Sequence, residues 1–143
     1  MSYASAEVTP NAADDTPTGD AEPIVRKFQR ELSAGLTSLV LLSVLSDAQS
    51  DLYGYEIARL LGADPAAASP FKQGALYPVL RNMSAAGLLT SRVVPSYSGP
   101  PRRYYRITPL GRDVLAAWRA TWTETRSFVD SIVHRATTEE TTP

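Results

Sequence analysis

The feature that most limits the fold of this chain is a change of periodicity at Gly87. Before this glycine, the segment 73–87 carries apolar side chains at helical spacing. After it, the segments 88–94 and 102–108 are rich in β-forming residues. The segment 95–101 between them contains three prolines and one glycine, which are typical of a turn. Since helical patterns precede this hairpin, the sequence predicts a winged helix-turn-helix, mainly α with a small β-hairpin wing.

Two predicted helices precede the segment 73–87. The first runs from about residue 24 or 26 to residue 46, and its segment 39–45 is apolar almost all round, as in a buried helix. The second covers about residues 53–61. Gly54 weakens its first turn, which indicates a close approach by another helix or by a phosphate, and packing is the favoured interpretation. The expected cap of this helix is Ser50 or Asp51, and its expected inward side chains are Ile57, Leu60 and Leu61.

The polar face of the helix at 73–87 has the chemistry of a DNA-reading surface. Gln73, Tyr77 and Arg81 lie four residues apart and supply an amide, a phenol and a guanidinium. Such groups can hydrogen bond to base edges and phosphates in a major groove. The alternative is an ordinary amphipathic helix with a solvated face. The apolar stripe behind this face consists of Leu76, Leu80 and Met83.

The second strand of the wing is unusually basic. Arg102 and Arg106 are expected on one face of the strand, and Arg103 on the other with Tyr105 and Ile107. Clustered guanidinium groups beside a Pro-Pro turn favour contact with a sugar-phosphate backbone or a minor groove. The alternative is a surface hairpin whose charges only aid solubility.

A last helix is predicted from Pro109 to about Arg135, capped by Thr108. It would be about 40 Å long, well beyond a domain with a radius of gyration near 13 Å. Because its apolar stripe continues to the end, a second copy of the chain is the expected partner. Trp118 and Trp122 lie one turn apart on this helix and predict either a site for a planar aromatic effector or plain interface packing.

The amino-acid composition limits the classes of function that this chain can have. The chain has no cysteine and a single histidine, His134, which is interpreted as a surface residue. Residues 26–135 hold all fourteen basic residues against eight acidic ones, which suits a polyanionic partner. Without a Gly-rich phosphate loop or a pair of catalytic carboxylates, the sequence predicts that the chain is not an enzyme and needs no cofactor or metal. Without an apolar span or signal peptide, it predicts a cytoplasmic protein with no membrane contact.

These patterns divide the chain into four parts. Residues 1–24 are expected to be a disordered acidic tail, and 25–108 a winged-helix DNA-binding domain. Residues 109–135 form the expected dimerisation helix. The remainder, 136–143, is expected to be a second disordered tail.

Five short motifs resemble the PadR family of bacterial transcriptional regulators over about residues 32–133. They stand in the family's order and at similar spacing, and together they form a specific match. The motifs are Tyr53-Gly54-Tyr55-Glu56-Ile57, Gly74-Ala75-Leu76-Tyr77-Pro78-Val79-Leu80, Gly87-Leu88-Leu89, Gly99-Pro100-Pro101-Arg102-Arg103-Tyr104-Tyr105-Arg106-Ile107-Thr108, and Gly111-Arg112.

The resemblance implies a homodimeric repressor of the shorter subgroup with one C-terminal helix. It implies binding to a palindromic duplex, with Tyr77, Arg102 and Arg103 at positions of DNA contact. The faces on which they are expected, and their polar or charged side chains, add further residues to these candidate DNA contacts: Lys72, Gln73, Arg81 and Arg106. Some relatives bind flat aromatic compounds between subunits, which makes Trp118 and Trp122 candidate effector contacts. The alternative function is a winged helix that binds other proteins and not DNA.

Overall fold

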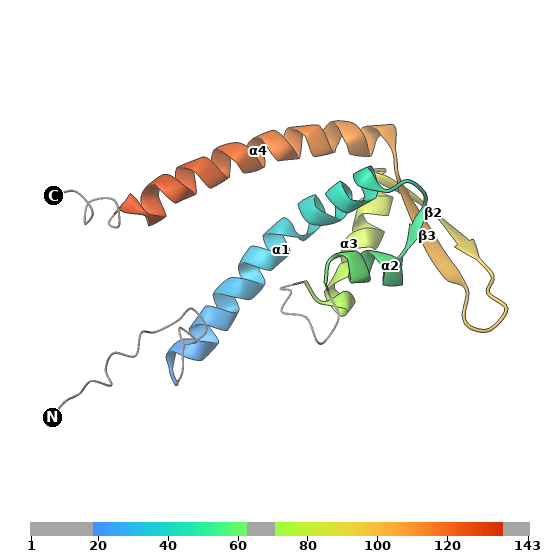
Figure 1. Ribbon diagram of the computed structural model, residues 1–143, viewed down its shortest axis with the longest axis horizontal. Coiled ribbons are helices and arrows are strands. Elements are labelled where there is room, and N and C mark those ends of the chain that lie inside the picture. The colour runs from blue at the N-terminus through green and yellow to red at the C-terminus, as the bar shows by residue number, and fades with distance from the viewer. Residues whose placement is uncertain (1–18, 63–70, 136–143) are drawn as a thin grey trace, which may run out of the picture.

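The computed structural model describes residues 19–62 and 71–135, so the tails at 1–18 and 136–143 and the linker at 63–70 lie outside the described residues. The elements are α1 (Ala21–Asp47), β1 (Leu52–Tyr53), α2 (Gly54–Leu60), α3 (Gln73–Ala85), β2 (Leu89–Val94), β3 (Arg102–Ile107) and α4 (Pro109–Val133). Three helices and a small antiparallel sheet therefore form a winged helix, and α4 extends away from it (Figure 1). The mainly α fold with a β-hairpin wing is confirmed. None of the helices in the described part of the chain has the length and apolarity to cross a membrane.

The core forms where apolar faces of all four helices meet the inner face of the sheet. The predicted stripe of α3 is confirmed, because Leu76, Leu80 and Met83 are all buried. The remaining core members are Leu41, Leu42 and Leu45 of α1, Ile57 and Ala58 of α2, Leu88, Leu89, Tyr105 and Ile107 around the sheet, and Leu115 of α4. After α3, Gly87 adopts φ +84°, the left-handed conformation that lets the chain reverse into β2.

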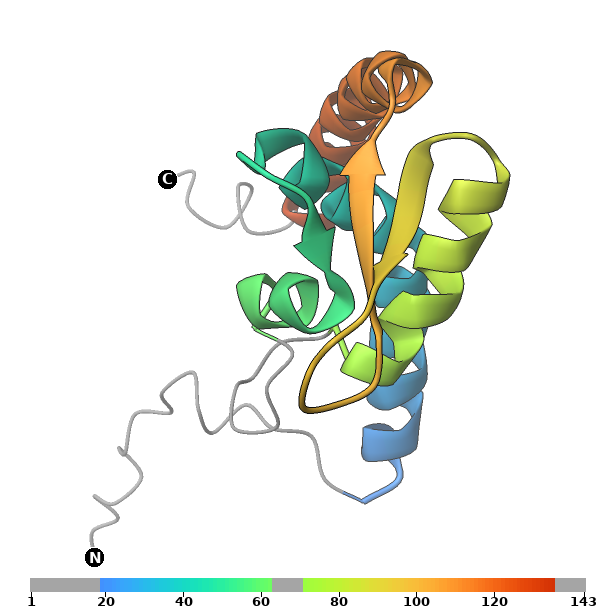
Figure 2. The same ribbon diagram turned by 90° about the vertical axis from the view of Figure 1, so that its right-hand side faces the viewer.

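The sheet has three strands, and the first of them was not predicted. Its order is β1-β3-β2, with β3 in the middle (Figure 2). Leu52 pairs with Tyr105, and Tyr53 pairs with Tyr104. Tyr53 is thus a strand residue that also serves as the N-cap of α2. A two-residue strand has no detectable periodicity and exists only through its pairing with β3.

Two details of the second predicted helix are wrong. Its cap is neither Ser50 nor Asp51, because α2 starts after Tyr53, whose backbone N–H donates to Glu56 Oε1 at 3.1 Å. Leu60, expected to face inward, is 63% exposed. The first helix also starts earlier than predicted, at Ala21, so four residues assigned to the acidic tail belong to α1.

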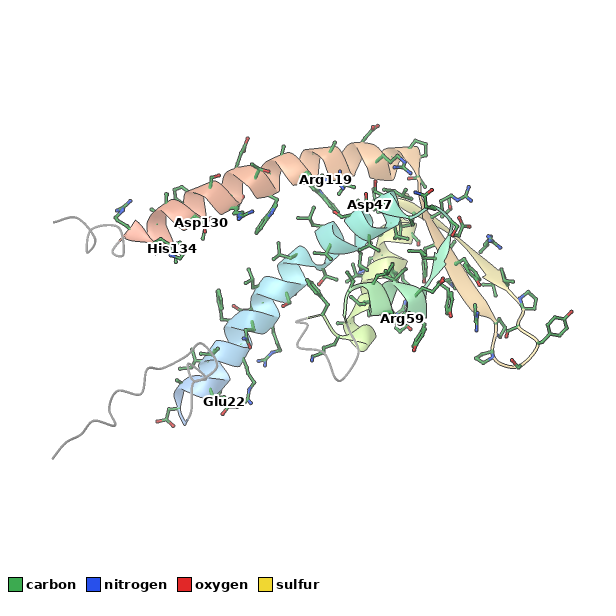
Figure 3. The ribbon with its side chains drawn as sticks, in the orientation of Figure 1. Glu22, Asp47, Arg59, Arg119, Asp130 and His134 are labelled. Carbon is green, nitrogen blue, oxygen red and sulfur yellow. The ribbon has the colours of Figure 1, made fainter. Side chains whose placement is uncertain are left out.

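The long helices α1 and α4 approach each other beside the sheet and diverge towards their other ends (Figure 1). Thr108 caps α4 as predicted, and its Oγ1 accepts from the Gly111 N–H at 3.0 Å. His134 ends α4 as an exposed residue, far from the sheet, beside Asp130 (Figure 3). Beyond Trp118 the apolar side chains of α4 are exposed, as are those of the first half of α1: Ile24, Phe28, Leu32, Trp122, Phe128, Val129, Ile132 and Val133.

Candidate nucleic-acid interface

Helix α3 presents its polar face because its apolar face is fixed in the core. With Leu76 and Leu80 buried, Arg81 points away from the core and is exposed, as is Lys72 at the N-cap. Gln73 is the first residue of α3. Lys72 and Arg81 thus place two exposed cations at the N-terminal end of α3 and along its solvent-facing side.

Tyr77 has a packing role that the sequence only hinted at. A Cβ atom on Gly54 would overlap Cε1 of the Tyr77 ring and would lie 3.3 Å from its Cζ and hydroxyl oxygen. The close approach predicted at Gly54 is therefore confirmed, and the approaching group is an aromatic ring of α3. Tyr77 is half-buried, and its ring packs against Gly54 at the start of α2.

The wing carries two exposed arginines next to its turn. Arg102 pairs in register with Val94, directly beside the segment 95–101. Arg103 follows, and its Nη1 donates to Ser91 Oγ of β2 at 3.0 Å. The backbones of both arginines thus lie where the strands enter the turn, and the Arg103 guanidinium group reaches back along the hairpin to Ser91.

Arg106 is held elsewhere, by Asp51, which the sequence offered only as a possible helix cap. Its Nε lies 2.5 Å from Asp51 Oδ1, and the Nε of Arg92 lies 3.0 Å from Asp51 Oδ2. Arg106 is also four residues from Arg102, which is about 13 Å along a strand. Its charge is therefore paired away from the turn, and Asp51 ties both hairpin strands to the segment before β1.

The ion pairs at Asp51 act on its protonation. The Arg106 hydrogen bond and then that of Arg92 favour the carboxylate, and they hold the pKa of Asp51 below its ordinary value in spite of partial burial. The carboxylate is well shielded, since its side chain is only 12% exposed. Asp51 stays ionised at neutral pH and neutralises part of the charge of the two arginines.

The charges of α3 and of the wing lie on neighbouring surfaces. Burial raises the pKa of the Tyr105 hydroxyl, while the charges of Arg103 and Arg81 act in the opposite direction. The Tyr77 side chain acts to raise the pKa of the same hydroxyl. One buried tyrosine thus lies within electrostatic range of three of the predicted DNA contacts, from both α3 and β3. These three residues lie on α3 and on the neighbouring β3, whereas Arg106 is paired with Asp51.

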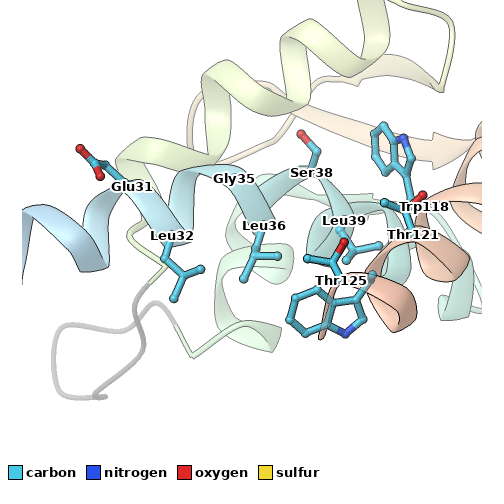
Figure 4. A pocket seen from close by; sticks show the side chains of 10 residues that line it. Glu31, Leu32, Gly35, Leu36, Ser38, Leu39, Trp118, Thr121 and Thr125 are labelled. Atoms are coloured by element: carbon cyan, nitrogen blue, oxygen red, sulfur yellow. The ribbon is translucent and has the colours of Figure 1, made fainter. Parts of the chain in front are cut away.

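A second candidate site lies between the two long helices. A cleft of about 540 Å³ opens between α1 and α4 (Figure 4). Trp118 and Trp122 form its wall on α4, as their spacing predicted, and Leu32, Leu36 and Leu39 face them from α1. Trp118 is half-buried, and Trp122 is 38% exposed. The cleft is mainly apolar and open to solvent.

Several solved structures with a similar architecture are transcriptional regulators. The family model of the PadR-like transcriptional regulators matches residues 41–117. A PadR family regulator from Eggerthella lenta is 32% identical, with 79% of this chain and 95% of that chain covered and a TM-score of 0.63. A regulator from Clostridium thermocellum is 25% identical, with 72% and 98% covered and a TM-score of 0.62. An uncharacterized protein from Lysinibacillus sphaericus is 28% identical over 66% of this chain and 84% of its own length.

The family match covers more than half of the chain, from α1 through the wing and into α4. It favours DNA binding over a winged helix that serves only protein contacts, and it agrees with the prediction that the chain is not an enzyme. The protein belongs to the PadR-like family and is a DNA-binding transcriptional regulator.

Proposed function

We propose that this regulator is a homodimeric, sequence-specific repressor that binds a palindromic duplex. In this proposal residues 25–108 bind DNA, with α3 in the major groove and the wing on the backbone. The observation that carries it is the position of α3 beside β2, which pairs with β3, so that the exposed Arg81 and the arginines of the wing lie on neighbouring elements (Figure 2). A duplex that meets one of these elements also meets the other.

The proposed DNA contacts follow from exposure and from the partners that each side chain already has. Gln73, at the start of α3, is the proposed base-reading residue, because an amide can bond to adenine in two places. Arg106 is assigned to the Asp51 ion pair and acts as an anchor of the wing. The proposed phosphate and groove contacts are Lys72, Tyr77, Arg81, Arg102 and Arg103.

Dimerisation is proposed through α1 and α4, with residues 109–135 as the main dimerisation helix. Phe28 is 61% exposed and Val133 is also 61% exposed, and both belong to apolar stripes that continue past the core. Stripes of this length on two diverging helices match the self-complementary surface of a two-fold dimer. Two copies would place two α3 helices on successive major grooves of a palindromic site.

Release by a planar aromatic effector is the finer part of the proposal. The cleft beside Trp118 and Trp122 is large enough for a small ligand, and indole rings stack on flat or cationic molecules. The competing interpretation is that a second copy fills the cleft and that both indoles only pack. Titration of the pure protein with phenolic acids and planar cationic dyes, followed by Trp fluorescence, separates the two. Quenching that also loosens the DNA complex supports an effector, and no response assigns both residues to packing.

The DNA proposal is tested with a duplex that the purified protein selects from a random library. Arg103→Ala should weaken binding to all sequences and lower the slope of log affinity against log salt by about 0.9 per lost phosphate contact. Gln73→Ala should instead change the preferred sequence. Arg119→Ala is the matched control, because it removes the same charge from α4, away from the wing (Figure 3). Equal losses for Arg103→Ala and Arg119→Ala would reject the assigned surface.

The dimer is tested by light scattering after size-exclusion chromatography. Ile132→Asp places a charge in the exposed apolar stripe of α4 and should convert the dimer into a monomer. Thr123→Asp adds the same charge at an exposed position outside that stripe and should leave the dimer intact. A monomeric wild-type protein, or an unchanged Ile132→Asp dimer, would contradict this interface.

A further inference from the structure

The outer face of the sheet carries a cluster of tyrosine rings and guanidinium groups that surrounds Arg102, one of the proposed DNA contacts. The Tyr53 ring lies 5.4 Å from the Tyr104 ring between centroids. The Cζ atom of Arg102 lies 4.5 Å from the centroid of Tyr53, and that of Arg92 lies 5.1 Å from the centroid of Tyr104. Each ring therefore supports one arginine through a cation–π contact.

Strand register explains why these groups meet. Tyr53 of β1 and Arg92 of β2 both pair with Tyr104 of β3, so the three side chains cross the sheet in one row. Arg102 is two residues before Tyr104 and points to the same face. Its side chain reaches from the central strand across to β1, where it covers the Tyr53 ring.

Arg102 is held in a different way from Arg92 and Arg106. Asp51 accepts the Nε–H of each of the other two arginines and neutralises part of their charge. An aromatic ring supports the flat face of the guanidinium and leaves its N–H groups and full charge available. Within residues 19–62 and 71–135, no carboxylate forms an ion pair with Arg102.

The Tyr53 ring is itself well fixed. Its backbone is paired with β3 and its N–H donates to Glu56 Oε1 at 3.1 Å. The Tyr104 ring packs against the Tyr53 ring in a tilted arrangement. The Tyr55 ring stacks on the Tyr53 ring, with 6.4 Å between their centroids. A ring held by two strands and a helix start is a rigid support for a long and flexible arginine side chain.

We propose that Tyr53 is a positioning residue that holds Arg102 with its N–H groups free to bind a phosphate of duplex DNA. This inference rests on the proposed role of Arg102 in the DNA interface. It adds that the short strand β1 contributes to DNA binding through the wing, although Tyr53 itself touches no phosphate. Loss of the ring returns rotational freedom to Arg102, which must then be ordered again when DNA binds.

A double-mutant cycle on the full-length protein tests this. Tyr53→Leu should weaken binding to the selected duplex about two- to tenfold, which is the cost of ordering one long side chain. Tyr53→Phe keeps the ring face and should bind like the wild type. In an Arg102→Ala background, Tyr53→Leu should have no further effect, because the side chain that it positions is gone. Affinity is measured by fluorescence anisotropy at several salt concentrations, with thermal unfolding recorded for each variant.

The possible results separate this inference from the proposed function. If Arg102→Ala binds like the wild type, the DNA role of Arg102 is wrong and the inference falls with it. If Arg102→Ala is weak and Tyr53→Leu binds normally, the DNA role stands and the positioning role is rejected. Equal losses from Tyr53→Leu in both backgrounds also reject positioning, since Tyr53 then acts without Arg102. Should Tyr53→Leu fail to fold, phenylalanine and pentafluorophenylalanine at position 53 compare rings of similar shape with and without a negative face.

Discussion

A side chain at Gly111 should destabilise the junction between the wing and α4. A Cβ atom there would overlap the carbonyl oxygen of Leu88 and would lie 2.7 Å from Cγ1 of Ile107. The same Leu88 oxygen accepts the N–H of Thr108 at 3.0 Å, and the N–H of Gly111 donates to Thr108 Oγ1. An added methyl group therefore displaces backbone that already holds the start of α4, and no flexible side chain can relieve the contact.

Gly111→Ala sets two effects against each other. Helix propensity favours alanine by about 1 kcal/mol, while overpacking against fixed atoms costs about 1–3 kcal/mol or more. Because a backbone carbonyl must move, we expect the steric effect to prevail by about 2 kcal/mol, which lowers Tm by about 8–15 °C for a unit of this size. Thermal unfolding by circular dichroism, at one fixed protein concentration, measures the change.

Gly74→Ala is the matched control for this experiment. A Cβ atom at Gly74 meets nothing within 4 Å, and the residue lies in the first turn of α3. The same substitution should therefore leave Tm unchanged or raise it slightly. A Gly111→Ala protein that melts at or above the wild-type temperature would refute the steric reasoning and would mean that the junction can relax.

Three further predictions concern the wing and its supports. Asp51→Asn should lower the free energy of unfolding by about 1–2 kcal/mol at pH 7. Because folding lowers the pKa of Asp51, the wild type should lose this contribution as pH falls below the ordinary value of 3.8, whereas Asp51→Asn should show a flatter profile in urea unfolding between pH 5 and pH 3. Arg106→Gln should also destabilise the fold, yet leave the salt slope of DNA binding unchanged. Gly54→Ala should displace the Tyr77 ring and reduce DNA affinity, and an unaltered anisotropy titration would show that Tyr77 can move without consequence.

Periodic segments were predictable because their burial follows from local spacing. The apolar stripe of α3 repeats every three or four residues, and a helix with that pattern has one way to face a core. The wing followed from prolines and a glycine between two β-rich segments. Trp118 and Trp122 could be assigned to one face of α4 for the same reason, although their spacing said nothing of α1, which forms the opposite wall of the cleft.

The short strand β1 could not be predicted in the same way. Leu52 and Tyr53 become a strand only because Tyr105 and Tyr104, more than fifty residues later, offer backbone partners. Every feature that depends on this pairing was missed with it, including the ion pairs of Asp51 and the support of Arg102. Local patterns carry no information on such contacts, since two residues are too few to show a period.

Contacts between distant residues also decide how much positive charge the wing presents. A count along the hairpin gives four arginines, but Asp51 neutralises part of the charge of Arg92 and Arg106. Arg102 rests on an aromatic ring, and Arg103 donates to a neutral serine hydroxyl, so both keep their full charge. These two adjoin the turn, while the neutralised pair lies nearer the base of the hairpin. Arg102 and Arg103 therefore supply most of the positive charge that the hairpin offers to a phosphate, because the partners of each arginine decide which charges a polyanion can use.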